Sequence, residues 1–256
     1  MNDTPHIEVR GLEVAYGTFV VLHDVSFQVQ RGEVFVIMGA SGCGKSSVLR
    51  HMIGLTETSK GEILVNGQSL VTASAQERDS MTSRFGVLFQ AGALWSSMTL
   101  AENVALPLEH STDLSPAEVA ELVRLKLAWV GLKGFEDFYP AEVSGGMVKR
   151  AGLARAMALD PEILFFDEPS GGLDPVTARR LDELILQLRD SLGTTVVMVT
   201  HELASIFAVA DNAIFLNAQT RTLTAWGSPC QLLKEAKDPA VREFLTRGEA
   251  LGAATH

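Results

Sequence analysis

A glycine-rich stretch with a lysine and serines, GASGCGKSS, occupies residues 39–47 and has the residue types needed to bind phosphate. It follows the apolar run EVFVIM and precedes VLRHMIGL, a pattern typical of a strand, a tight loop and a helix. Glycines permit positive φ and let backbone N–H groups converge on one anion, and the helix adds its positive end. Lys45 supplies a charge for terminal phosphates and Ser46 a hydroxyl for a magnesium ion, which favours a nucleoside triphosphate site over a plain glycine turn. The expected phosphate-binding residues are Gly39, Ala40, Ser41, Gly42, Cys43, Gly44, Lys45, Ser46 and Ser47.

Two adjacent acids, Asp167 and Glu168, follow the apolar run ILFF, where a buried strand should end. Ligands of open α/β sheets bind at the carboxyl ends of the strands. In such a site Asp167 would help to hold the hydrated magnesium bound by Ser46, and Glu168 could polarise a water for attack on a γ-phosphate. The pair alone would favour a strand-end turn with solvated carboxylates, but beside the glycine loop the catalytic interpretation is preferred.

A second candidate anion site lies in the stretch VSGGMVKR, residues 143–150. Ser144 can cap a helix, while Gly145 and Gly146 expose backbone N–H groups at its positive end. Here the sequence resembles the nucleotide-binding subunits of ATP-binding cassette (ABC) transporters, whose signature is Leu-Ser-Gly-Gly-Gln. In that family the signature of one subunit closes on ATP held by the phosphate loop of another. The alternative is an ordinary capped helix that begins with glycines.

The resemblance extends over residues 7–235 and implies further site residues. Tyr16 in VAYG matches the aromatic that stacks on adenine, although alone it would suit a small core. Gln90 in LFQAGALW matches the glutamine that touches magnesium and water, and His201 in VTHE matches the histidine that contacts the γ-phosphate. Asp174 in SGGLDP matches the D-loop at the subunit interface, and it could equally cap the helix that Pro175 enters. The implied catalytic residues are Glu168, His201, Lys45 and Gln90, and the implied metal ligands are Ser46, Gln90 and Asp167.

The signature departs from the family pattern at Met147, which replaces glutamine, and at Val143, which replaces leucine. A thioether cannot donate a hydrogen bond, so a contact made by glutamine is lost or moves to the backbone. SGGM before KRAGLARA, with FQAGALWSSMTLAENVALPL and the ending DPAVREFL, resembles the branch that serves Mce-type phospholipid transporters of Gram-negative envelopes. This implies ATP and Mg²⁺ as cofactors, a second copy of the chain, an integral permease, an Mce-domain lipid-binding protein and a STAS-domain protein. It also implies a place on the cytoplasmic face of the inner membrane, held there by the permease.

Other functions remain open on the sequence. The chain could serve a different ABC solute importer or exporter, or be a non-transport ABC ATPase of DNA repair, translation or iron–sulfur assembly. Repair forms carry long coiled-coil inserts and translation forms usually carry two cassettes, and neither feature is visible. A P-loop kinase is disfavoured by VSGGM and SGGLDP.

The order of elements predicts an α/β fold with antiparallel strands and a helical insert, and the resemblance implies a P-loop NTPase of the ABC nucleotide-binding type with an antiparallel β subdomain and an inserted helical signature subdomain. Alternating strands over 7–37 and a hairpin in GEILVNGQSL precede helices from about 97 to 158, where Ser115 should cap a helix with Pro116 at its first position. Strands then alternate with helices, as in a parallel sheet. We expect an ATPase domain over 1–235, with a core of about 1–96 and 159–235 around the helical part of about 97–158. A C-terminal helix and tail fill 236–256, and GEALGAATH looks loose.

Composition narrows the function further. A net charge of −10 in 256 residues disfavours a general nucleic-acid binder, and neither a signal peptide nor a long apolar run is present. Two cysteines, Cys43 and Cys230, fit a reducing cytoplasm. Backbone N–H groups, a helix start and Lys45 should favour the Cys43 thiolate, so we expect it to react and nucleotide to protect it.

Ala91, Leu94 and Trp95 suit a groove for a partner helix, unless they are core.

Overall fold

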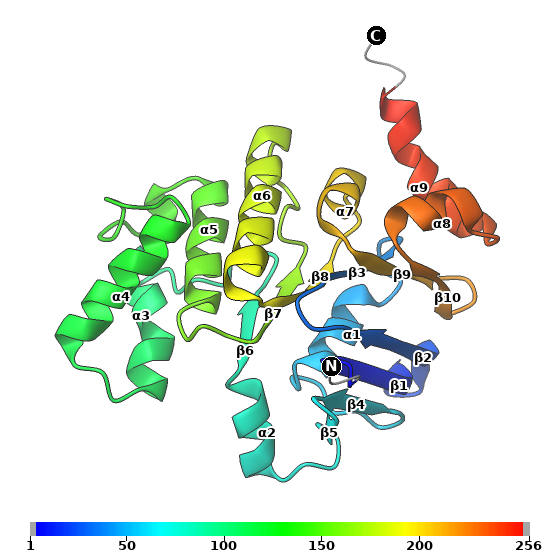
Figure 1. Cartoon of the computed structure of the whole chain (residues 1–256), viewed down its shortest axis with the longest axis horizontal. Coiled ribbons are helices and arrows are strands. Elements are labelled where there is room, and N and C mark those ends of the chain that lie inside the picture. The colour runs from blue at the N-terminus through cyan, green and yellow to red at the C-terminus, as the bar shows by residue number, and fades with distance from the viewer. Residues whose placement is uncertain (1–3, 253–256) are drawn as a thin grey trace.

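The computed structural model describes residues 4–252 and contains two β-sheets with helices around them (Figure 1). The smaller sheet is antiparallel, has the order β2-β1-β4-β5 and supplies the expected hairpins. Its strands alternate buried and exposed residues because one face covers a core. The strands are β1 (Ile7–Tyr16), β2 (Phe19–Val29), β4 (Glu62–Val65) and β5 (Gln68–Ser69).

The larger sheet has the order β10-β9-β3-β8-β7-β6, in which all strands but β10 run parallel. Every residue of β3, β7 and β8 is buried, as expected for parallel strands covered on both faces. The α/β prediction is therefore confirmed. The strands are β3 (Val34–Gly39), β6 (Phe85–Leu88), β7 (Ile163–Asp167), β8 (Thr195–Val199), β9 (Asn212–Asn217) and β10 (Thr222–Gly227).

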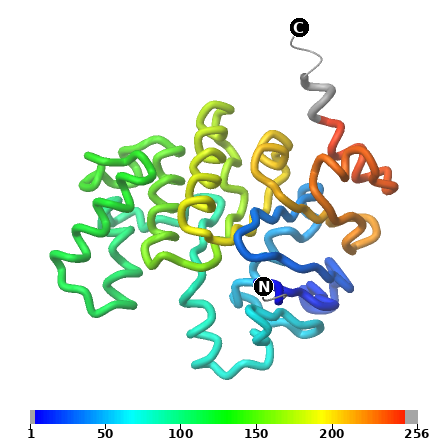
Figure 2. Tube along the Cα trace, in the orientation of Figure 1, coloured from blue at the N-terminus to red at the C-terminus, as the bar shows by residue number. Residues whose placement is uncertain are grey.

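Side-chain caps start most of the helices. Ser115 caps α4 with Pro116 in first place, as predicted, and Thr99 forms a capping box with Glu102 at the start of α3. The helices are α1 (Lys45–Met52), α2 (Ala75–Thr82), α3 (Leu100–Ser111), α4 (Pro116–Trp129), α5 (Gly145–Ala156), α6 (Pro175–Leu192), α7 (Leu203–Val209), α8 (Pro229–Glu235) and α9 (Pro239–Gly252), with a 3₁₀ turn at Pro140–Glu142. Figure 2 shows α3, α4 and α5 at one end of the molecule and the antiparallel sheet towards the other.

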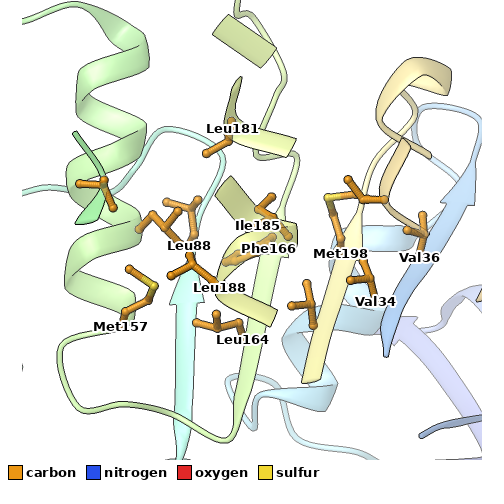
Figure 3. Close-up of a cluster of buried hydrophobic side chains, with 14 of the residues drawn as sticks. Val34, Val36, Leu88, Met157, Leu164, Phe166, Leu181, Ile185, Leu188 and Met198 are labelled. Carbon is orange, nitrogen blue, oxygen red and sulfur yellow. The ribbon is translucent and has the colours of Figure 1, made fainter. Parts of the chain in front are cut away.

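Two hydrophobic cores lie on opposite faces of the parallel sheet. Alternate residues of β3 enter different cores, with Val34 and Val36 in one and Phe35 and Ile37 in the other. Figure 3 shows the first core, where Leu181, Ile185 and Leu188 of α6 lie over the sheet. The second core joins the sheet to α1 and to the antiparallel strands. This packing fixes the carboxyl ends of the parallel strands relative to α1.

The end of the chain is more helical than the sequence suggested. We expected residues 248–256 to be loose, but α9 continues to Gly252, so the expectation is wrong for 248–252. The segment GEAL contains the strong helix formers Glu249, Ala250 and Leu251, and no proline interrupts it. Residues 253–256 lie outside the described part of the chain. Among residues 4–252, no helix is long and apolar enough to cross a membrane.

Candidate nucleotide site

The loop of residues 39–47 joins the end of β3 to the start of α1 and needs glycine at two points. Gly39 has φ +151°, and a Cβ there would lie 2.5 Å from the Leu216 carbonyl oxygen. Gly44 has φ +103°, and a Cβ there would lie 2.8 Å from Cδ1 of Leu22. A side chain at either position would strain the backbone and clash, so the glycines fix the turn. No side chain caps α1, which leaves its first N–H groups available for an anion.

Lys45 is almost buried beneath this loop. Its Nζ donates hydrogen bonds to the carbonyl oxygens of Gly39 at 3.0 Å and Ala40 at 3.2 Å. It also lies 3.9 Å from Oε1 of Glu168. The ammonium therefore sits where the loop and the acidic strand end meet, and a bound phosphate could take over its backbone contacts.

Ser46 and Asp167 form a direct link between α1 and β7. The Ser46 hydroxyl donates a 2.7 Å hydrogen bond to Oδ1 of Asp167, which is 6% exposed. A hydroxyl and a carboxylate at this spacing are hard oxygen ligands. Mg²⁺ in nucleotide sites uses few protein ligands and keeps waters and phosphate oxygens, so this pair fits such an ion.

Glu168 has the most constrained backbone of the site. It adopts φ +52°, a left-handed conformation uncommon for a residue with a side chain, and strain of this kind clusters at functional sites. Its Oε1 lies 2.8 Å from Nδ1 of His201, and its buried Oε2 has no hydrogen-bond partner within residues 4–252. The expected neighbouring strands are confirmed, because Asp167 at the end of β7 pairs with Val199 at the end of β8.

Tyr16 borders the loop on its outer side. Its hydroxyl lies 2.8 Å from the Ser47 hydroxyl, while the residue remains 56% exposed, which leaves the ring available for stacking. Phe19 pairs with Tyr16 across the hairpin and is 58% exposed, with the Arg221 guanidinium 5.1 Å from its ring centre. The sequence analysis did not identify Phe19 as a second exposed aromatic beside Tyr16. Its position opposite Tyr16 in a short hairpin was the signal that could have shown this.

The signature stretch, residues 143–150, starts helix α5. The Ser144 hydroxyl accepts a hydrogen bond from the Met147 N–H at 3.3 Å, which confirms the predicted cap. Gly145 is exposed, but Gly146 is buried, and a Cβ there would lie 2.7 Å from Cγ2 of Thr177 on α6. Gly146 therefore allows α5 to pack closely on α6, whether or not its N–H also binds an anion. The Met147 thioether packs on the first core.

Asp174 caps α6, accepting hydrogen bonds from the N–H groups of Val176 and Thr177 at 3.1 Å each. The Thr177 contacts lower the pKa of this carboxyl. The capping interpretation of Asp174 is thus confirmed. Its role at a subunit interface stays a prediction.

The structure does not gather all expected site residues within one chain. Lys45, Ser46, Asp167, Glu168 and His201 lie together, with Tyr16 linked to Ser47. Gln90 is exposed two residues beyond Leu88, which pairs with Phe166, and so it lies at the end of the adjacent strand. Figure 1 places α5, with Ser144, in a different part of the molecule from α1. Within one chain, the signature stretch and the phosphate loop are therefore separate.

Residues 22–171, more than half of the chain, match the family model described as ABC transporter. The chain belongs to the ABC transporter family. ATP is the nucleotide that ABC ATPases bind, and the chain is an ATP-hydrolysing enzyme. The resemblance inferred from the motifs is thereby confirmed.

Relatives and solved structures agree with this membership. The chain is 42% identical over 246 residues to the "Probable ribonucleotide transport ATP-binding protein mkl" of Mycobacterium tuberculosis, covering 96% of this chain and 67% of that protein. It is 38% identical over 239 residues to the "Intermembrane phospholipid transport system ATP-binding protein MlaF" of Escherichia coli K12, covering 93% and 88%. The ATP-binding cassette MJ0796, solved as a dimer bound to ADP and Pi, has a TM-score of 0.79 and 26% identity, covering 87% of this chain and 98% of that one.

Two expectations about side chains in this ABC ATPase need correction. Cys43 is only 2% exposed and lies in the second core, and burial raises the pKa of its thiol despite nearby Lys45. A reactive thiolate was therefore the wrong expectation, and Cys43 can contribute only backbone to phosphate binding. Leu94 packs against the first core, whereas Trp95 is 62% exposed, so of these two residues only Trp95 fits a free docking surface.

Proposed function

We propose that this ABC ATPase is the energy-coupling subunit of a membrane transporter that moves phospholipids between the inner and outer membranes. The joint placement of Lys45, Ser46, Asp167, Glu168 and His201 supports a motor for ATP hydrolysis. The identity to the protein named MlaF supports the phospholipid cargo. The name of the mycobacterial relative supports ribonucleotides as a second candidate cargo.

The site geometry supports the following roles in hydrolysis. The amides of the phosphate loop and Lys45 bind the phosphates, with Lys45 exchanging its contacts to loop carbonyls for phosphate oxygens. Glu168 orients the attacking water through its carboxylate and accepts its proton, while His201 holds Oε1 and approaches the γ-phosphate. Ser46 and Asp167, with Gln90 as a further ligand, would hold Mg²⁺, which neutralises charge on the phosphates.

Two copies of the chain complete each site. The start of α5 has Ser144 and Gly145 exposed and Gly146 buried behind them, and its N–H groups can face an anion, yet within one chain it lies apart from the phosphate loop. Asp174 sits at the start of the next helix along the chain. The solved dimers of MJ0796 support a pairing in which the α5 terminus of one copy covers ATP bound by the other. The helical part, about 97–158, would then act as the unit that carries the signature.

A permease would dock beside Trp95. A cleft of about 840 Å³ opens between α3 and α4 and begins at Ser97 and Met98, close to Trp95 along the chain. Its floor is apolar, and its acidic residues outnumber the single arginine, Arg124. This surface suits an amphipathic helix with basic residues from the cytoplasmic side of an integral permease. The acids that line the cleft are Glu102, Glu109, Glu136 and Asp137.

The remaining partners rest on the branch resemblance alone: an Mce-domain lipid-binding protein and a STAS-domain protein. The assembly would hold the chain on the cytoplasmic face of the inner membrane, without a role for nucleic acid. The test is purification of the intact complex from membranes and its reconstitution into vesicles with ATP. Transfer of a fluorescent phospholipid that Lys45→Ala abolishes would support the proposal. Uptake of a labelled ribonucleotide without lipid transfer would overturn it in favour of the second cargo.

A further inference from the structure

Lys149 of the signature helix contacts the loop that carries Glu168. Its Nζ donates to the backbone carbonyl oxygens of Glu168 at 3.3 Å and Gly171 at 2.5 Å. Lys149 is 7% exposed and makes no ion pair within 4 Å in the described part of the chain. A buried ammonium has a large desolvation cost, so its two carbonyl contacts with the catalytic loop are the compensation that keeps it there.

These contacts bear on the strained residue of the site. The Glu168 N–H donates to the Val199 carbonyl at 2.9 Å, and its own carbonyl accepts from the Gly171 N–H at 3.2 Å as well as from Lys149. Both sides of a backbone with φ +52° are thus fixed, one by β8 and one by α5. A left-handed non-glycine residue persists only where its surroundings determine it in this way.

The same helix is tied to the segment that faces the proposed permease site. Arg155 of α5 donates to the carbonyl oxygens of Ala93 at 2.7 Å and Gly92 at 3.0 Å. Helix α5 therefore joins three features: the partner-facing segment through Arg155, the signature through Ser144, and the catalytic loop through Lys149.

We propose that Lys149 is a positioning residue that holds the Glu168 carboxylate in place and makes its position depend on helix α5. Closure of α5 on ATP in a second copy would thereby be transmitted to the catalytic carboxylate of its own site. Burial lowers the pKa of Lys149, and the negative charge of Glu168 opposes that change. The inference rests on the proposed role of Glu168 as the residue that activates water.

The test replaces Lys149 with methionine, which has a similar length and no donor. We expect kcat for ATP hydrolysis to fall about 10- to 100-fold, as for a misplaced catalytic group, with KM for ATP within about twofold of wild type. Lys149→Arg can still donate to both carbonyls, so its kcat should lie between those of wild type and Lys149→Met. This variant replaces Lys149→Met in the test if the methionine variant does not fold. Lys126→Met is the control, because Lys126 is also buried in the helical part but contacts Asp160 instead.

A double variant separates positioning of Glu168 from support of the signature. Glu168→Gln with Lys149→Met should dimerise on ATP as well as Glu168→Gln alone, since Lys149 acts through Glu168. A kcat of Lys149→Met within twofold of wild type overturns the inference, and so does loss of dimerisation in the double variant. If kcat falls equally in Lys126→Met, the loss reflects stability and the inference also fails. A wild-type chain without ATPase activity would instead contradict the proposed function itself.

Discussion

Oε1 of Glu168 lies 2.8 Å from Nδ1 of His201, so the segments that follow β7 and β8 are joined by a direct contact at the proposed site of hydrolysis. The other carboxylate oxygen, Oε2, is buried and has no partner among the described residues. A buried carboxylate oxygen without a partner is costly. One oxygen is thus held by the histidine, and the other remains free to accept a hydrogen bond from a water.

Glu168→Gln should abolish hydrolysis while preserving ATP binding. The amide can still contact His201 but cannot accept a proton, so turnover should drop about 100-fold or more, the range of a general base. The variant keeps the phosphate loop and the hydrogen bond between Ser46 and Asp167, so it should still bind ATP. Because the bound ATP is not hydrolysed, it should hold two chains together. Light scattering with and without Mg-ATP measures this dimer. Lys45→Ala is the contrasting variant, because it should weaken nucleotide binding itself, and near-wild-type turnover of Glu168→Gln would exclude Glu168 from this role.

Local features of the fold could be predicted from the sequence because they depend on near neighbours along the chain. Ser115 with Pro116 and Asp174 with Pro175 act within a few residues of their own positions. The glycines at 39 and 44 could be predicted from the loop pattern, although the atoms that exclude a side chain there belong to the distant Leu216 and Leu22. The apolar runs before Gly39 and Glu168 likewise predicted buried parallel strands.

Features that depend on distant partners could not be predicted. The Cys43 thiol is buried because Gly39, Leu216 and the second core surround the loop, which no local pattern reveals. Leu94 and Trp95 are adjacent and similar in character, yet one packs inward and the other outward. The contact of Lys149 with the loop that carries Glu168 joins two motifs that the sequence analysis treated separately.

Cys230 should react with thiol reagents much faster than Cys43. Cys230 is exposed on α8, whereas Cys43 is buried with a raised thiol pKa, and the thiolate is the reactive form. Alkylation at pH 7.5, followed by mass spectrometry, should label Cys43 at least about tenfold more slowly, with or without Mg-ATP. Denaturant should equalise the two rates. Rapid labelling of Cys43 that Mg-ATP blocks would contradict this result and restore the expectation from the sequence.

Asp182 of α6 should make stability depend on pH. Burial raises its pKa to about 6, against an ordinary value of 3.8, although Ser205 donates a 2.8 Å hydrogen bond to it. Because the folded-state pKa is the higher one, the protonated carboxyl contributes stability that is complete below about pH 4 and is lost as pH rises through about 6. Two pKa units correspond to ~3 kcal/mol.

Asp182→Asn removes this titration and retains an acceptor for Ser205. Relative to wild type, its free energy of unfolding should therefore improve by about 2 kcal/mol between pH 4.5 and pH 7.5. Urea denaturation at both values measures the change. Asp190→Asn is the control for an exposed carboxyl on the same helix, because Glu183 contributes to the raised pKa of Asp182 and cannot serve. If the difference in the free energy of unfolding between Asp182→Asn and wild type stays constant with pH, Asp182 is not the source of the pH dependence.

Trp95 and Leu94 give a paired test of the permease surface. Two hydrogen bonds hold the Trp95 backbone to Asn103, at 2.7 and 3.1 Å, while its side chain is exposed, so Trp95→Asp should leave the melting temperature nearly unchanged. Trp95→Asp removes the exposed indole and puts a carboxylate that must lose its water in place of an apolar contact, so co-purification with the permease should fail while basal ATPase activity persists.

Leu94→Asp should behave differently because Leu94 packs on the first core. A carboxylate placed against apolar side chains costs about 2 kcal/mol or more, and the melting temperature should fall by several degrees. Thermal denaturation and pull-down of the membrane complex are therefore measured together for both variants. Trp95→Asp that keeps its permease would exclude this surface. If Trp95→Asp loses the permease yet cells show no envelope or lipid defect, the transporter assignment stands and the phospholipid cargo fails.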